Sequence, residues 1–394
     1  MRIYSCVLAF FTAYAITFYV LPSIIKIARV KGLTDEPGER RSHSQSTPSL
    51  GGVGIFAGVL FSVIAWTPHM YFEGLQYVMC ACIVVFLIGA KDDILPSRPW
   101  TKMLGQLFAA AILVWAADVR IPSLYGIAGV TELPFWVSAA LTIFTIIVII
   151  NAFNLIDGVN GLTGTISIVS AAALGSWFYL VGHPEYTLLA AALIGSTVAF
   201  LKYNWTPAKI FMGDTGSLLL GLLMSVLTIR FLQFHTEMPR DNPFYFPAAP
   251  AAAIGFLLVP LFDTLRVFVT RAYKGRSPFR PDRGHIHHLL VDLGFTHGQT
   301  TLILGAITVV FIAMVVSLQW LGNLALAGLI VLIAALATGS LQLQLKRRER
   351  AAAKKLAAES LAAESHVAGS ATVPGAGASG PSTSVGVASE TQGA

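Results

Sequence analysis

The chain has 394 residues, of which 55% are hydrophobic and only 12% are Asp, Glu, Lys or Arg. Soluble domains typically carry about 25% charged residues, so this composition excludes a disordered chain, a coiled coil and an ordinary soluble enzyme. The net charge of +6 would suggest nucleic acid in a soluble protein. In a membrane protein it is better explained by basic cytoplasmic loops, and no nucleic-acid partner is expected.

Apolar segments follow one another along the chain, and a helix needs about 20 such residues to cross the hydrocarbon core. They predict an all-α, polytopic integral membrane protein with about 11 transmembrane helices. The first segment imitates a signal peptide, but its apolar run is longer than a typical signal-peptide core, so we interpret it as a retained span. The segments lie near residues 3–25, 50–68, 75–90, 103–118, 134–150, 163–182, 187–201, 215–233, 247–265, 300–319 and 322–341.

Lys and Arg are distributed unequally between the two sets of connections. One set contains 22 of the 26 basic residues, and the positive-inside rule assigns that set to the cytoplasm. This orientation places the N-terminus outside and the C-terminus in the cytoplasm. The cytoplasmic set comprises residues 26–49, 91–102, 151–162, 202–214, 266–299 and 342–394.

The chain divides into a transmembrane domain, residues 1–341, and a cytoplasmic tail, residues 342–394. The tail begins with a sequence that favours helix. It then becomes rich in Gly, Ser, Ala, Thr and Pro after about residue 366, a composition that predicts disorder.

Two acidic clusters lie at the ends of apolar segments on the cytoplasmic side. Asp92 and Asp93 are adjacent, so they could share a cation, although a solvated helix end would also explain them. Asp214, in the segment FMGDTGS, either caps a helix or ligates Mg²⁺, which prefers oxygen donors. Both clusters lie where a soluble substrate and a lipid headgroup can meet.

A polar repeat interrupts the apolar pattern in the segment NAFNLIDGVNGL, residues 151–162. Asn151, Asn154, Asp157 and Asn160 recur every three residues, which at helical spacing places them along one side. Caps and turns also favour Asn, Asp and Gly. Four such residues exceed what a cap needs, so we interpret the segment as functional.

Arg and His are concentrated in residues 260–290. No set of ligands here has the spacing of a structural zinc site. Arginine recognises phosphate oxygens through forked donors, so the cluster suits a diphosphate better than a metal. The cluster includes Arg271, Lys274, Arg276, Arg280, Arg283, His285, His287 and His288.

Five segments follow one another along the chain: the first loop DEPGERRSHSQSTPSLGG, then DD, NAFNLIDG, FMGDTGS and PDRGHIHH. In these five segments and in their order, the chain resembles the polyprenyl-phosphate N-acetylhexosamine-1-phosphate transferases. The resemblance covers about residues 3–341. It implies an enzyme of the bacterial inner membrane, with its active site on the cytoplasmic face. Such an enzyme transfers a sugar phosphate from a UDP-sugar to a polyprenyl phosphate, uses Mg²⁺ and releases UMP.

The His-Ile-His-His sequence resembles the branch that uses UDP-N-acetylglucosamine and undecaprenyl phosphate to initiate O-antigen, common antigen or teichoic acid linkage units. The branch that uses UDP-muramoyl pentapeptide usually has three consecutive histidines. Three alternatives stay open: the donor could be another UDP-amino sugar or UDP-muramoyl pentapeptide, the cation could be Mn²⁺ in place of Mg²⁺, and the protein could form a homodimer.

The resemblance also implies roles for single residues. Asp214 is expected to be the principal Mg²⁺ ligand and Asn154 the second, and Asp92 and Asp93 are expected to act on the lipid phosphate. Asn160 replaces an Asp of many bacterial relatives and so cannot be a base. Lys102 lies farther from the Asp pair than in the peptidoglycan branch. The residues expected to bind the nucleotide are Asp157, Asn160, Phe211 and Lys102. Those expected to take part in catalysis, besides the two aspartates, are His285, His287 and His288. Those expected to bind the diphosphate or the sugar are Arg271, Arg276, Arg280 and Arg283.

Two other classes of protein compete with an enzyme. A transporter of lipid-linked sugars predicts ionisable residues within the spans and an internal repeat. The assigned spans contain few ionisable residues, and we find no repeat. A scaffold that docks other enzymes would be separated from a transferase by the release of UMP.

Overall fold

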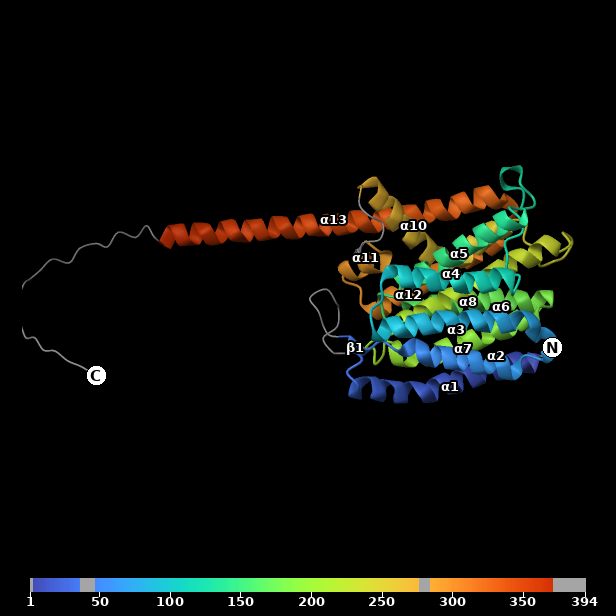
Figure 1. Cartoon of the computed structure of the whole chain (residues 1–394). Coiled ribbons are helices and arrows are strands. Elements are labelled where there is room, and N and C mark those ends of the chain that lie inside the picture. Colours follow the sequence, from blue (N-terminus) through green and yellow to red (C-terminus); the bar gives the residue numbers. More distant parts are fainter. Residues whose placement is uncertain (1–2, 36–46, 276–283, 371–394) are drawn as a thin grey trace, which may run out of the picture. The chain divides into compact units, whose positions relative to one another are not determined.

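The computed structural model describes residues 3–35, 47–275 and 284–370. The chain forms two units, Met1–Gln342 and Leu343–Ala394, and the first is a bundle of helices (Figure 1). Its described strands are β1 (Thr34–Asp35) and β2 (Thr47–Pro48), which pair antiparallel with Thr34 opposite Pro48. The described part of the second unit is helical. The all-α class of membrane protein is confirmed.

The described residues contain thirteen α-helices and three short 3-10 helices, η1 to η3. They are α1 (Ile3–Val30), α2 (Gly51–Trp66), η1 (His69–Tyr71), α3 (Phe72–Ile94), α4 (Pro99–Trp115), η2 (Ile127–Gly129), α5 (Phe135–Leu155), α6 (Leu162–Val181), α7 (Pro184–Asn204), α8 (Gly213–Glu237), α9 (Ala249–Phe256), α10 (Leu258–Tyr273), α11 (Ile286–Asp292), α12 (His297–Ser317), η3 (Gln319–Leu321) and α13 (Asn323–Ser370).

Each predicted apolar segment is helical. Among the described residues, eight helices are long and apolar enough to cross a membrane, or nine if α9 and α10 form one bent span. The short helix α2 is apolar but has only 16 residues. The chain is therefore a multi-pass membrane protein, whereas the number of eleven spans and the orientation stay predictions.

The apolar segment 247–265 is not one straight helix, because α9 and α10 meet at an angle of 85°. Pro260 explains the break. In a continuous helix its ring would clash with the carbonyl group of Phe256, four residues earlier, whereas in the first turn of a new helix it is tolerated. The carbonyl group of Phe256 accepts a hydrogen bond from Ser170 Oγ at 2.7 Å instead.

Helix α8 forms the centre of the bundle. Every side chain from Thr215 to Leu232 is buried, and helices α2, α3, α5, α6 and α9 pack around it. A helix that is apolar on all sides is stable only when other helices cover all of it. The position of Asp214, in the first turn of α8, is therefore fixed by the core of the protein.

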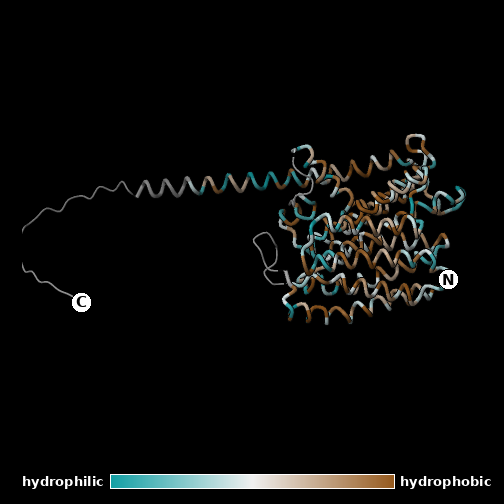
Figure 2. The backbone as a smooth tube through the Cα atoms, in the orientation of Figure 1, coloured by the Kyte–Doolittle hydropathy of each residue, from teal (hydrophilic) through white to brown (hydrophobic). Residues whose placement is uncertain are grey.

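Polar residues are confined mainly to the ends of this bundle. Figure 2 shows hydrophobic residues through its body and hydrophilic residues at helix ends. Because successive helices run in opposite directions, the segments with the predicted polar clusters lie at the end that carries β1, β2 and α11 (Figure 1). We call this end the site end, and the other the opposite end.

Candidate active site

The start of α8 is held by the segment that enters α2. The main-chain N–H of Phe211 donates to Pro48 O at 2.7 Å, and Phe211 O accepts from the N–H of Gly51 at 2.9 Å. These hydrogen bonds extend the short β2 strand onto the residues that precede Asp214. The predicted nucleotide-binding residue Phe211 is half-buried here.

Gly213 turns the chain from this segment into α8. Its φ of +71° is a conformation that residues with a Cβ rarely adopt. A Cβ atom would also lie 2.0 Å from Ser49 O and 2.6 Å from Asp93 Oδ2. Only glycine fits this position, which explains the residue that precedes Asp214.

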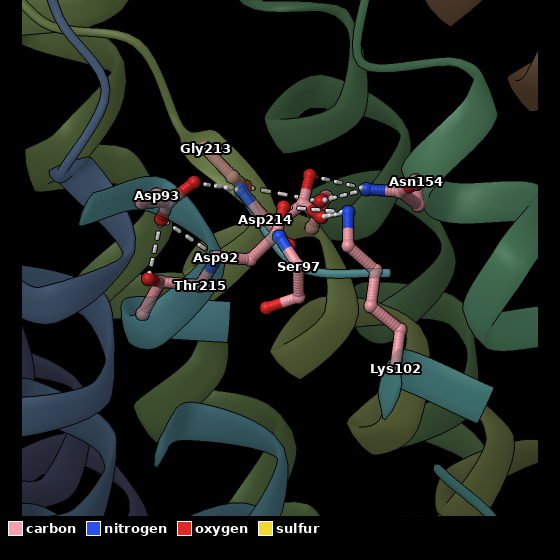
Figure 3. Close-up of polar contacts among 9 residues, drawn as sticks. Asp92, Asp93, Ser97, Lys102, Asn154, Gly213, Asp214 and Thr215 are labelled. Carbon is pink, nitrogen blue, oxygen red and sulfur yellow. Dashed lines mark hydrogen bonds and ion pairs between the residues drawn. The ribbon is translucent and has the colours of Figure 1, made fainter. Parts of the chain in front are cut away.

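Asp93 caps the N-terminus of α8. Its Oδ1 accepts a hydrogen bond from the main-chain N–H of Asp214 at 2.7 Å, and its Oδ2 accepts from the N–H of Thr215 at 3.0 Å and from the Thr215 hydroxyl (Figure 3). A carboxylate is favourable at a helix N-terminus because of the free N–H groups and the helix dipole. Both oxygens of Asp93 therefore hold Asp214 in place, whereas its predicted catalytic role stays a prediction.

Lys102 joins the other two carboxylates. Its ammonium group lies 2.6 Å from Asp92 Oδ2 and also forms an ion pair with Asp214 Oδ2 (Figure 3). Burial opposes the charge of Lys102, but the hydrogen bonds with Asp214 and Asp92 outweigh it and raise the lysine pKa. Asp92 Oδ1 accepts from the main-chain N–H of Ser97 at 2.7 Å. The lysine assigned to nucleotide binding thus lies within the carboxylate cluster.

Asn154 approaches Asp214 from α5. Its Nδ2 lies 3.0 Å from Asp214 Oδ1 and 2.9 Å from Ser217 Oγ. Asn151 lies one turn earlier, where its Nδ2 donates to Gln106 Oε1 at 2.7 Å. The structure thus brings Asn154 to the predicted metal ligand Asp214.

The prediction that four polar residues lie along one side of a helix is correct for Asn151 and Asn154 and wrong for Asp157 and Asn160. Helix α5 ends at Leu155, so Asp157 and Asn160 lie in the turn that precedes α6. The Asn, Asp and Gly residues that follow favour a turn over a continued helix. Asn160 is 6% exposed, and its Nδ2 lies 3.5 Å from Thr206 Oγ1.

The turn after α5 meets the histidine segment. A Cβ atom on Gly158 would lie 2.5 Å from Nε2 of His287, so the glycine makes room for the imidazole ring. Burial, with a smaller effect of His288, lowers the pKa of His287 to about 3, and this ring is neutral at pH 7. Burial raises the pKa of Asp157 well above its usual value, and the Asp214 and Asp93 carboxylates raise it further.

Asp263 holds the start of the histidine segment. Its Oδ2 lies 3.0 Å from His285 Nδ1, and its Oδ1 accepts from the N–H of Ile286 at 2.9 Å and from Arg266 at 3.0 Å. Arg266 also donates to Gly284 O. Neither Asp263 nor Arg266 is among the predicted site residues. Their i, i+3 spacing in one helix is a signal that could have identified the pair.

The structure describes two of the remaining predicted site residues, Arg271 and His288. Arg271 is buried in α10, and the ring of His288 lies 4.3 Å from that of His287, centre to centre. Arg276, Arg280 and Arg283 lie outside the described residues.

The carboxylate cluster fits a divalent cation. Oxygens of Asp92 and Asp214 converge on one positive group, the ammonium group of Lys102. The side-chain oxygen of Asn154 is an additional candidate ligand for a cation. Among the described side chains, no group of three or more His, Cys, Asp or Glu could hold a metal ion. A cation here would have to keep ligands from water or phosphate, which is how proteins commonly bind Mg²⁺.

Comparisons with known proteins show what the chain is similar to. Residues 75–232 match the family described as Glycosyl transferase family 4. The chain is 32% identical to the undecaprenyl-phosphate alpha-N-acetylglucosaminyl 1-phosphate transferase of Escherichia coli O157:H7, over 70% of this chain and 73% of that protein. It is 29% identical to the probable undecaprenyl-phosphate N-acetylglucosaminyl 1-phosphate transferase of Bacillus subtilis (strain 168), over 79% and 84%.

Proposed function

This chain belongs to glycosyl transferase family 4, and from that premise we propose that it transfers N-acetylglucosamine 1-phosphate from UDP-N-acetylglucosamine to undecaprenyl phosphate. The general activity, sugar-phosphate transfer by a multi-pass membrane enzyme, follows from its relatives and its apolar helices. The proposal adds the sugar, the release of UMP and a place at the first step of cell-envelope polysaccharide synthesis. It also assigns the site end to the cytoplasmic face of a bacterial inner membrane, as the basic loops predict.

The observation that carries the proposal is the meeting of Asp92, Lys102 and Asp214 at the ends of three helices. Both substrates are anions, and transfer between them requires that negative charge be neutralised while the reacting groups are held in line. A cluster of carboxylates with a cationic group meets this need. Its place at a helix end suits a reaction between a soluble nucleotide and a lipid phosphate.

In the proposed reaction, an oxygen of the lipid phosphate attacks the β-phosphorus of the UDP-sugar. The bond from that phosphorus to the oxygen shared with the α-phosphorus breaks, and UMP leaves with this oxygen. Asp92 accepts any residual proton of the lipid phosphate. Asp93 holds the first turn of α8, which fixes the direction of Asp214.

Asp214, with Asn154 beside it, would hold Mg²⁺, which when bound neutralises charge on the diphosphate. Lys102 provides a further positive charge next to these residues. His287 is a neutral ring against Gly158, so it can donate to or accept from an uncharged part of the sugar or nucleotide. Asp263 fixes Nδ1 of His285, which leaves Nε2 of that ring for the substrate.

The turn after α5 is the proposed site for the uridine. Asp157 and Asn160 lie in this turn, between the carboxylate cluster and the histidine segment. An amide such as that of Asn160 can both donate to and accept from a uracil edge. Asn160 is buried and Asp157 is half-buried, a setting that would limit the access of water to these hydrogen bonds.

The test is the release of UMP by the purified full chain in detergent with undecaprenyl phosphate. Each reaction contains UDP-N-acetylglucosamine, UDP-N-acetylgalactosamine or UDP-muramoyl pentapeptide, with Mg²⁺ or with a chelator. We expect Mg²⁺-dependent UMP with the first donor at the highest rate. Another preferred donor would overturn the sugar assignment, and no UMP from any donor would overturn the proposed reaction.

A further inference from the structure

Every carboxylate oxygen of the three clustered aspartates has a partner within the protein. The oxygens of Asp93 accept from the start of α8, and Asp92 Oδ1 accepts from the N–H of Ser97. Asp214 Oδ1 faces the amide of Asn154. The two oxygens that remain, one on Asp92 and one on Asp214, both contact Lys102 (Figure 3).

Lys102 is the partner that can leave most easily. The N–H groups of Ser97 and of α8 belong to the main chain, and Asn154 is a short side chain on α5. The ammonium group of Lys102, in contrast, is carried by a flexible four-carbon stem. Its side chain remains 27% exposed, so it can swing out without unfolding a helix.

We propose that Lys102 is an exchangeable counter-cation: it occupies the space between Asp92 and Asp214 until a divalent cation binds there, and then transfers its ammonium group to the diphosphate of the sugar nucleotide. This inference rests on the cation site of the proposed function. It adds that a residue of the protein competes with the cation for that site and is displaced by it.

Electrostatics favours this exchange. Two carboxylates attract one cation strongly, but an ammonium group and a divalent cation at hydrogen-bond distance from the same oxygens would repel each other. A displaced ammonium group is left without its two carboxylate partners. The diphosphate is the anion that arrives at the same site, so cation binding prepares Lys102 to bind the nucleotide.

The exchange predicts effects of opposite sign on two ligands. Removing the ammonium group removes a competitor of the cation, so the cation binds more tightly. The same change removes a partner of the diphosphate, so the nucleotide binds more weakly. Coupling between two ligands through one protein group commonly changes affinities about 5- to 150-fold, and we expect changes in this range.

The experiment measures Mn²⁺ binding by electron paramagnetic resonance on the full chain in detergent, without nucleotide. The variants are Lys102→Met, Lys102→Arg, Asp214→Asn and the matched control Lys91→Met, which removes an exposed lysine beside Asp92. Calorimetry then measures UDP-N-acetylglucosamine binding at saturating Mn²⁺. Melting temperatures with and without Mn²⁺ show whether each variant is folded.

We expect Lys102→Met to bind Mn²⁺ at least about fivefold more tightly and the nucleotide at least about fivefold more weakly. Lys102→Arg and Lys91→Met should stay near the wild type. Mn²⁺ should raise the melting temperature of Lys102→Met more than that of the wild type, since it restores the missing positive charge.

Unchanged or weaker Mn²⁺ binding by Lys102→Met would overturn the exchange. So would an absence of Mn²⁺ binding in both the wild type and Lys102→Met. Because binding is measured without turnover, these results are separate from the proposed reaction, which fails only if UMP is not released.

Discussion

At the site end Lys102 is paired with Asp92 and Asp214, whereas at the opposite end Arg230 donates to the main-chain carbonyl groups of Ala117 and Asp118. Arg230 is only 8% exposed, and it also packs over the ring of Tyr186. Its partners are two main-chain carbonyl groups just after the end of α4 and the side chain of Gln233, one turn farther along α8. The partners of Lys102 are charged side chains that can accept another cation instead.

The two ends show two uses of a charged residue in a membrane protein. A charged residue within or near the membrane is often functional, but Arg230 joins α8 to the C-terminal end of α4 and has a structural explanation. A cation that satisfies carbonyl groups stabilises one conformation. A cation shared by two carboxylates leaves a choice of partners, which binding and catalysis can use.

The largest effect should follow Asp214→Asn, at the centre of the site end. The variant removes one negative charge and weakens cation binding, so we expect UMP release to fall about a thousandfold, as for other groups that neutralise charge in phosphoryl transfer. The control at the opposite end is Asp118→Asn, since Asp118 is exposed and pairs with Arg120. Near-normal turnover by Asp214→Asn would contradict its role.

A smaller loss should follow Asp263→Asn, which weakens the hold on His285 without removing a group from the substrate site. We expect kcat to fall about 10- to 100-fold, as when an outer partner that orients a histidine is lost, with little change in KM. Asp263→Glu, which keeps the carboxylate, should recover part of the activity. A change confined to KM would show that Asp263 does not position His285 for the reaction.

The opposite end should respond in stability instead of activity. Arg230→Met leaves the carbonyl groups of Ala117 and Asp118 without their donor, which costs about 1–3 kcal/mol for a buried group. We expect a lower melting temperature, with kcat and KM for UDP-N-acetylglucosamine unchanged at temperatures well below melting. A specific loss of kcat in folded Arg230→Met would remove the distinction between the two ends.

The last effect concerns pH and His287. Because its pKa is lowered from 6.5 to about 3 in the folded protein, the unfolded chain takes up a proton at this residue first as the pH falls. His287 therefore contributes stability above pH 6.5 that is lost progressively toward pH 3. We expect the melting temperature of the wild type to fall more steeply over this range than that of His287→Gln. Equal slopes would mean that His287 is accessible to protons in the folded state.

Hydropathy alone predicts most of the helical framework, since a span requires about 20 apolar residues and few other structures satisfy its main chain. It does not predict the 85° bend after Phe256, because the sequence is apolar both before the bend, in α9, and directly after it, at the start of α10. Pro260 is the local signal, but its meaning depends on whether it falls within a helix or in its first turn. The end of α5 at Leu155 is missed for a similar reason, since its polar residues suit both a helix face and a turn.

The site is predicted as a set of motifs but not as a set of contacts. The motifs identify Asp92, Asp214 and Asn154, whose side chains the structure brings to Lys102 or to one another. That Lys102 joins two carboxylates depends on the packing of α3 and α4 against the rest of the bundle, which residue spacing does not encode. The same holds for Asp263 and His285, which are 22 residues apart.

The central account, that this membrane enzyme transfers a sugar phosphate at the Asp92–Lys102–Asp214 cluster, is tested most directly by following the β-phosphorus. UDP-N-acetylglucosamine labelled with radioactive phosphorus at the β-position is incubated with the purified chain and undecaprenyl phosphate. We predict that the label moves to the lipid together with the sugar, that UMP appears in equal amount, and that Asp214→Asn lowers both about a thousandfold. Label retained in released UDP, with only the sugar on the lipid, would contradict the account.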